Sequence, residues 1–340
     1  MTSQIEEEAP RAVSQRRGLQ AGLTRMGRRY GLQIGIVGVL LVIWMAFVIG
    51  APGTFLSPEI YAAYKSTIKI IAVMALPLTL VIIAGEIDLS FPSIMAIGMV
   101  VFVAVFTNTG SVLLAFILCL VTGFLVGLLN GVIVVRLGIP SLVATIGTQF
   151  FWRGAVLVIT NGKPASLVDA KGTLLREALV GRLGGYVPAQ MIWMVVVAIL
   201  VWILLNRHKL GAHVYLVGDN RDSARLMGVN VDRTRMLVFA LVGLAAALGG
   251  VLSSMEVSYL WVTLGEGYLL RTLAPVFLGG TSVFGGTGTI FGTFIACLII
   301  GAIEGGIVAI GLTGFWTQLI NGLIIVLSVA MQALLSRRLA

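Results

Sequence analysis

Long apolar runs separated by short polar segments fill most of the chain. A run of about 20 apolar residues is long enough to cross a lipid bilayer as a helix. The runs are continuous and do not alternate between polar and apolar residues, which favours helices over the strands of a barrel. We therefore expect an all-α, polytopic inner-membrane protein. The pattern predicts ten spans, at 31–50, 65–84, 92–107, 111–135, 139–160, 190–206, 236–256, 268–284, 288–310 and 315–335.

Composition agrees with this interpretation. The chain is 58% hydrophobic and 11% charged, with a mean hydropathy of +1.04, whereas a soluble domain carries about 25% charged residues. Its 42 glycines suit helices that approach one another closely in a membrane. The net charge of +9 does not indicate nucleic-acid binding, because the basic residues lie in short segments between spans. Cys119 and Cys297 lie inside apolar runs, which favours buried free thiols over a disulfide or a metal site.

The basic segments predict the orientation of the chain, because cytoplasmic loops of membrane proteins are rich in Lys and Arg. Residues 1–30 hold six arginines and are expected to form a cytoplasmic tail, followed by a single transmembrane domain over 31–340. Ten crossings then place Arg136, the segment 206–235 and the pair Arg337-Arg338 on the same side as that tail. Both termini are therefore expected in the cytoplasm.

The loop 161–189 faces outward in this topology although it is also basic. Its residues 167–179 have the pattern of a short amphipathic helix lying on the outer surface. A docking role for a partner and an ordinary surface loop both remain open at this point.

We call the segment 206–235 the platform. It contains six of the 23 Lys and Arg residues, and 219–228 within it predicts one short helix. Asn220 is a good N-cap, Arg225 lies late in the helix where its charge suits the dipole, and Gly228 can take the left-handed conformation that ends it. A helix this short needs a surface on which to bury its apolar positions, which is either the protein's own loops or another protein's groove. These positions are Ala224, Leu226 and Met227.

Two segments interrupt the helical pattern, at 84–92 and at 278–289. Each follows an apolar stretch that contains a proline, Pro77 or Pro275, and each leads into another span. Broken helices in corresponding halves of a transporter point to a substrate path. The alternative is that both are tight turns near the inner face.

No pattern for chemistry on a nucleotide or a peptide is present. The Gly-rich stretch 279–292 has no lysine, so it is not a phosphate-binding P-loop, and there is no catalytic motif or cluster of metal ligands. The sequence therefore predicts no catalytic residue, no metal and no cofactor. Polar residues in or near the spans are candidates for lining a path for a neutral, hydroxyl-rich solute, although hydrogen bonding between helices is the alternative role. They are Asp88, Asn130, Thr145, Gln149, Glu304, Gln318 and Asn321.

Two other classes of protein are alternatives to a transporter that is driven by a protein docked on the platform. An ion-coupled secondary carrier usually needs acidic residues deep in the membrane, and only Glu304 lies plainly inside a predicted span. A membrane scaffold or receptor without transport is the other alternative.

Four stretches resemble the permease subunits of bacterial ABC importers for ribose and other simple sugars. They are GEIDLSFPS (85–93), GLLNGVIVVRLGIPSLVATIGT (127–148), GAHVYLVGDNRDSARLMGVNVDRTR (211–235) and GGTSVFGGTGTIFGT (279–293). The resemblance covers about residues 35–335. The usual motif of that family reads GGIDLS followed by VGS, so Glu86 and the pair Phe91-Pro92 depart from it and leave the solute open.

The resemblance implies a ten-helix permease of the bacterial inner membrane that works in contact with membrane lipid as a dimer with a second permease copy. A periplasmic sugar-binding protein would deliver a monosaccharide or polyol, and a cytosolic ABC ATPase, which binds the ATP, would dock on the short cytoplasmic coupling helix at 219–228. The residues expected to couple to the ATPase are Asn220, Ala224, Arg225, Leu226, Met227 and Gly228.

Overall fold

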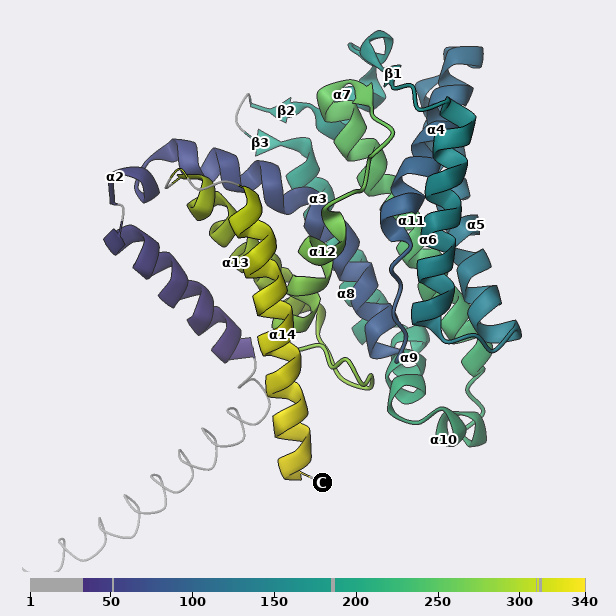
Figure 1. The fold of residues 1–340 in the computed structure, drawn as a ribbon, viewed down its shortest axis with the longest axis vertical. Helices are drawn as coiled ribbons and strands as arrows, with labels where there is room; N and C mark the ends of the chain where they lie inside the picture. Colours follow the sequence, from purple (N-terminus) through teal and green to yellow (C-terminus); the bar gives the residue numbers. More distant parts are fainter. Residues whose placement is uncertain (1–32, 51, 185–186, 310, 312–313, 340) are drawn as a thin grey trace, which may run out of the picture.

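The computed structural model describes residues 33–50, 52–184, 187–309, 311 and 314–339, and Figure 1 shows them as a bundle of helices of unequal length. Within these residues, eight helices are long and apolar enough to cross a membrane. They are Gln33–Gly50, α4 (Phe91–Thr109), α5 (Val112–Arg136), α6 (Ser141–Thr160), α8 (Ala189–Asn206), α11 (Val231–Val257), α13 (Ile290–Ala309) and α14 (Gly314–Leu339).

Two shorter apolar helices complete the set. One is Ile68–Ile83, the apolar part of α3 (Pro58–Ile83), and the other is α12 (Tyr268–Leu278). Each of the ten predicted spans thus corresponds to a helix, and the all-α, polytopic class is confirmed. The predicted tail at 1–30 and the start of the first predicted span lie outside the described residues.

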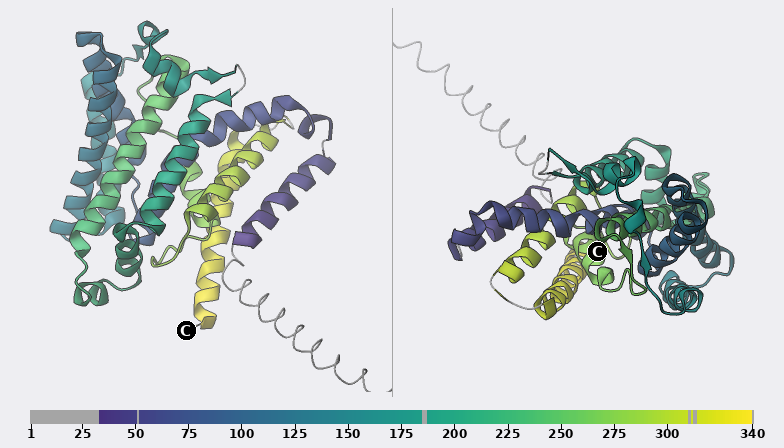
Figure 2. Two further views of the ribbon diagram at one scale, coloured as in Figure 1. Left: turned by 180° about the vertical axis from the view of Figure 1, so that it is seen from behind. Right: turned by 90° about the horizontal axis from the view of Figure 1, so that it is seen from above.

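The centre of the bundle is formed by α3 and α11, while the helix Gln33–Gly50 and α5 stand at opposite margins (Figure 2). Close packing of α5 on α11 depends on glycines spaced four residues apart, at Gly123, Gly127 and Gly131. A Cβ atom at Gly127 would lie 2.4 Å from the Phe239 carbonyl oxygen, so only glycine allows this approach. The abundance of glycine in the sequence is explained in part by this interface.

The loop 161–189, which is predicted to face outward and is called the outer loop below, lies at the opposite end of the bundle from the platform (Figure 1). It contains the short helix α7 (Leu174–Val180), and its first strand pairs with the strand that follows α11, Ala165 opposite Leu260. The loop and the chain after α11 are therefore tied together. The remaining short elements are α2 (Pro52–Phe55), β1 (Ala165–Ser166), η1 (Val168–Ala170), β2 (Arg182–Leu183), β3 (Val187–Pro188) and β4 (Tyr259–Leu260).

The platform contains two helices, α9 (Lys209–Asp219) and α10 (Arg221–Leu226). The prediction of one helix starting at Asp219 was wrong at that end, because Asp219 is the last residue of α9. The predicted capping is confirmed: the Ser223 N–H donates to Asn220 Oδ1 at 2.8 Å, and Gly228 has a φ of +81°. Asn220 therefore ends one helix and begins the next, a corner that the sequence pattern did not separate.

Candidate functional site: a cavity between two helix starts and the platform

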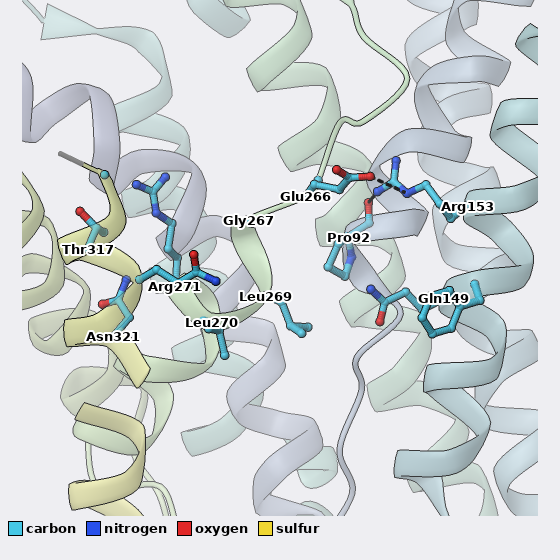
Figure 3. A pocket seen from close by; sticks show the side chains of 14 residues that line it. Pro92, Gln149, Arg153, Glu266, Gly267, Leu269, Leu270, Arg271, Thr317 and Asn321 are labelled. Atoms are coloured by element: carbon cyan, nitrogen blue, oxygen red, sulfur yellow. Dashed lines mark hydrogen bonds and ion pairs between the residues drawn. The ribbon is translucent and has the colours of Figure 1, made fainter. Parts of the chain in front are cut away.

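A cavity of about 640 Å³ opens between α4 and α6 on one side and α12 and α14 on the other (Figure 3). Its wall combines polar side chains of five types (Gln, Arg, Glu, Thr and Asn) with apolar ones (Pro, Phe and Leu), so it is suited to a small polar molecule with some apolar surface. The lining residues are Pro92, Gln149, Phe150, Arg153, Gly265, Glu266, Gly267, Leu269, Leu270, Arg271, Gly314, Thr317, Gln318 and Asn321.

Two helices begin at this cavity. Pro92 lies in the first turn of α4, and Gly267 is the N-cap of α12 (Figure 3). The two starts lie next to each other, because a Cβ atom at Gly265 would be 2.0 Å from the Pro92 carbonyl oxygen. Each helix is preceded by non-helical chain, at 84–90 and at 258–267. Helices that begin inside a membrane bundle present unpaired N–H groups there, and transporters use such ends around their substrate.

The α12 and α14 wall carries a buried ion pair. Arg271 Nε lies 2.9 Å from Glu304 Oε1, and Asn321 Nδ2 donates to the same oxygen at 3.2 Å. Arg271 lines the cavity and its side chain is 38% exposed. Asn321 is 1% exposed and its Oδ1 has no partner among the described residues. This wall therefore carries the Arg271 donors and, buried beside them, an acceptor without a partner, while the formal charges of Arg271 and Glu304 cancel.

On the opposite side, Arg153 holds the chain that precedes α12. Its guanidinium donates to the carbonyl oxygens of Val262 and Leu264, both at 2.8 Å, and its Nε lies 3.8 Å from Glu266 Oε1 (Figure 3). Backbone without regular secondary structure inside a membrane bundle needs such partners. Arg153 therefore mainly holds the backbone of the cavity wall in place.

Of the predicted path residues, Gln149, Gln318 and Asn321 line the cavity and come from α6 and α14. Glu304 lies behind Asn321 and Arg271. Asp88, Asn130 and Thr145 are buried away from the lining residues, and a role for these four in the path stays a prediction.

The buried residues near the first break have an evident structural role. Asp88 Oδ1 accepts from the Ser90 N–H at 2.8 Å, and Asn130 Nδ2 donates to Ser90 Oγ at 2.6 Å. Thr145 Oγ1 accepts from the Leu89 N–H at 3.1 Å. Asp88 and Thr145 therefore satisfy N–H groups of the extended backbone at 87–90, and Asn130 fixes the Ser90 hydroxyl beside them.

The two predicted breaks have different positions. The first, 84–92, reaches the cavity through Pro92. The second, 278–289, lies beside the platform, since Tyr215 Oη donates to the Gly288 carbonyl oxygen at 2.8 Å. The segment that corresponds to 84–90 at the cavity is 258–267, which the sequence analysis did not single out. Its signal was the sequence Gly-Glu-Gly at 265–267, where both glycines have positive φ.

The end of the platform presents an exposed apolar pair. Leu226 is 90% exposed and Met227 is 68% exposed, whereas Ala224 is buried against Val217 and its neighbours. Arg225 lies beside them and pairs with Asp222 and Asp232 at 3.4 and 3.7 Å. Of the two surfaces considered from sequence, the protein's own loops cover Ala224 only. Among the described residues, no three His, Cys, Asp or Glu side chains are grouped as metal ligands.

Residues 60–329 match the family described as "Branched-chain amino acid transport system / permease component". The ribose import permease protein RbsC of Escherichia coli is 31% identical over 313 residues, which cover 90% of this chain and 97% of that protein. RbsC of Bacillus subtilis is 31% identical over 279 residues, covering 81% and 85%. The autoinducer 2 import system permease protein LsrD of Yersinia enterocolitica is 29% identical over 313 residues, covering 89% and 92%. No solved structure matches the chain.

Proposed function

The chain belongs to the permease components of ABC importers, and from this membership we propose that it forms the membrane path for a neutral monosaccharide or polyol. In this family the permease is the non-catalytic transmembrane subunit, so ATP is bound and hydrolysed by a partner and this chain needs no cofactor. The relatives named for ribose and autoinducer 2 import support a small hydroxyl-bearing solute.

The cavity wall at Arg271 and Asn321 is the observation that carries the proposed substrate class. A hydroxyl group both donates and accepts, so a solute hydroxyl can accept from Arg271 and donate to Asn321 Oδ1 once movement of the wall uncovers that buried atom. Glu304 neutralises Arg271, so nothing in this pair demands an anionic solute. A buried acceptor without a partner disfavours an apolar solute, which would leave it unsatisfied.

The partners follow from the two ends of the molecule. A cytosolic ATPase docks on α10, where Leu226 and Met227 are exposed. A periplasmic binding protein docks on the outer loop around α7, and a second permease copy completes the complex. Closure of the ATPase moves α10 and rocks the two permeases between outward-facing and inward-facing states.

Uptake in proteoliposomes tests this proposal. The complex with its cognate ATPase and binding protein is reconstituted, and a panel of radiolabelled monosaccharides and polyols that includes ribose is offered with and without internal ATP. We expect uptake of at least one of them that requires both ATP and the binding protein. Uptake by the permease alone, driven by a pH gradient, would instead establish the secondary carrier. Absence of both uptake and solute-stimulated ATP hydrolysis would favour a scaffold.

Replacement of Asn321 by leucine should lower uptake of the transported solute by about tenfold, because one lost hydrogen bond in a dry site is equivalent to about 1.4 kcal/mol. The variant keeps the volume of the side chain approximately and removes both polar atoms. Initial uptake rates at low solute concentration measure the effect. Asn108→Leu, at the exposed end of α4 and away from the cavity, is the control. Equal rates in both variants would remove Asn321 from the path.

Cysteine labelling should establish the proposed topology. Cys119 and Cys297 are both buried and free, so the wild-type chain should react little with a membrane-impermeant maleimide. Leu174→Cys on α7 should label in intact cells, whereas Leu226→Cys on α10 should label only after permeabilisation. The reverse pattern would place the platform, and with it both termini, outside.

A further inference from the structure

We propose that Glu86 is a positioning residue that transmits the movement of α10 to the wall of the cavity. The inference rests on the proposed function. Glu86 follows α3 in the first break and is 3% exposed. Its carboxylate is the meeting point of three segments that are far apart in sequence: the first break, the start of α10 and the first turns of α11.

One oxygen of Glu86 binds two arginines. Glu86 Oε1 accepts from an Arg221 terminal nitrogen at 2.6 Å and from Arg235 Nε at 2.6 Å. The same Arg221 nitrogen also donates to the Gly85 carbonyl oxygen at 3.2 Å. Arg221 is the first residue of α10 and Arg235 lies in α11. We call these three side chains the Glu86 cluster.

The cluster is a stiff connection. Short, charge-assisted hydrogen bonds hold their geometry more strongly than neutral ones. Removing one partner of a buried ion pair leaves an uncompensated charge, which resists separation of the segments. With two guanidinium groups on one carboxylate, α10 cannot shift relative to α11 without moving Glu86 or breaking a pair.

Backbone contacts beside the cluster reinforce the connection. The Gly286 N–H donates to the Ile83 carbonyl oxygen at 2.8 Å, so the second break is fastened to the end of α3. In α9, Gly218 lies so close that a Cβ atom there would be 1.7 Å from the same Ile83 oxygen. Burial raises the pKa of Tyr215, so its hydroxyl remains protonated and donates to Gly288. Both platform helices therefore contact the breaks through rigid groups.

The chain between Glu86 and the cavity is short, and side chains hold several of its backbone N–H groups. Ile87 N–H donates to Ser141 Oγ at 3.0 Å, which ties the segment to α6. Five residues beyond Ile87, Pro92 lines the cavity, and Ser93 Oγ donates to the Gln149 carbonyl oxygen at 2.8 Å. A displacement of Glu86 therefore reaches the residues on the α4 and α6 side of the cavity without crossing any flexible loop.

The other cavity segment has a corresponding connection on the outer side. The Leu167 N–H donates to the Ser258 carbonyl oxygen at 3.0 Å, and Arg176 donates to Ser258 Oγ at 3.2 Å. The chain at 258–267 is thus fastened to the outer loop, while 84–90 is fastened to the platform by Glu86. The two non-helical segments that reach the cavity are therefore linked to opposite ends of the protein.

Measurement of solute moved per ATP hydrolysed tests the role of Glu86. Glu86→Gln, reconstituted with the cognate ATPase and binding protein, should copurify with the ATPase and hydrolyse ATP at the wild-type rate. Solute moved per ATP should fall about tenfold, which is within the usual range of coupling between sites. Glu256→Gln is the matched control, because it removes an ion pair with Lys69 that also joins α3 to α11, away from the platform. The Glu256→Gln variant should move as much solute per ATP hydrolysed as the wild type, even if less of the protein folds.

Arg221→Gln keeps the test decisive if Glu86→Gln does not fold, because Arg235 still neutralises Glu86. It should lower the same ratio, and the double variant with Glu86→Gln should show no further loss, since both act through one contact. An unchanged ratio in both single variants would overturn the inference, as would loss of ATPase binding in Arg221→Gln, which would make Arg221 a docking residue. Failure of the wild-type complex to import any solute would contradict the proposed function instead.

Discussion

A Leu226→Glu variant is expected to lose ATP-dependent uptake and to copurify with little or no ATPase. Leu226 is 90% exposed, so its side chain contributes little to folding and its replacement should change the free energy of unfolding by no more than about 0.5 kcal/mol. An exposed leucine on a charged surface buries its apolar surface only when a partner protein covers it. A charge placed in the centre of a protein interface costs about 2 kcal/mol or more, roughly a 30-fold loss of affinity.

The outer face supplies a matched control for this prediction. Leu174 is also 90% exposed and lies in a short helix, α7, at the opposite end of the protein. Leu174→Glu should copurify with the ATPase at the wild-type level, so any effect of general surface charge is separated from docking. Pull-down from detergent-solubilised membranes measures the association. Equal ATPase recovery with the two variants would exclude Leu226 from the docking surface.

The sequence pattern was sufficient for the ten apolar helices and for the capping of α10, although not for the separation of α9 from α10. Each predicted span has a helix because the requirement to satisfy every backbone group in lipid leaves few alternatives for long apolar runs. Asn220 and Gly228 were identifiable because capping depends on local geometry, which residue type largely determines.

The cavity was predictable only in part, because it depends on contacts between segments far apart in sequence. Gln149, Gln318 and Asn321 were found from their polarity, but polarity alone did not separate them from Asn130, which holds the Ser90 side chain, or from Thr145, which binds backbone. The distinction requires knowing which side of each helix faces a neighbour.

The Glu86 cluster was beyond sequence reasoning for the same reason. Glu86 was noted as a departure in a suspected path, yet its partners Arg221 and Arg235 lie 135 and 149 residues away. The arginines of the platform were interpreted through the rule that positive charge marks the cytoplasmic side, which says nothing about individual pairs.

Replacement of Gly218 by alanine should be among the most damaging single-methyl changes in the platform. By helix propensity alone, alanine would stabilise α9 by about 0.8–1.0 kcal/mol. The added Cβ atom would, however, lie 1.7 Å from the Ile83 carbonyl oxygen and 2.6 Å from the Gly286 nitrogen. Both are backbone atoms and cannot rotate away, so α9 must separate from the two breaks. Overpacking of this kind costs about 1–3 kcal/mol, occasionally more.

Thermal unfolding in detergent, followed by size-exclusion chromatography, distinguishes these opposing effects. Gly147→Ala in α6 is the control, because a Cβ atom there would meet nothing within 4 Å; its unfolding midpoint should stay the same or rise. A midpoint for Gly218→Ala at or above that of the wild type would show that α9 does not need its close contact with Ile83.

If Gly218→Ala folds but is less stable, it should also move less solute per ATP. Separation of α9 from 84–90 loosens the connection that the Glu86 cluster then maintains alone, so combining Gly218→Ala with Arg221→Gln should lower that ratio below either single variant.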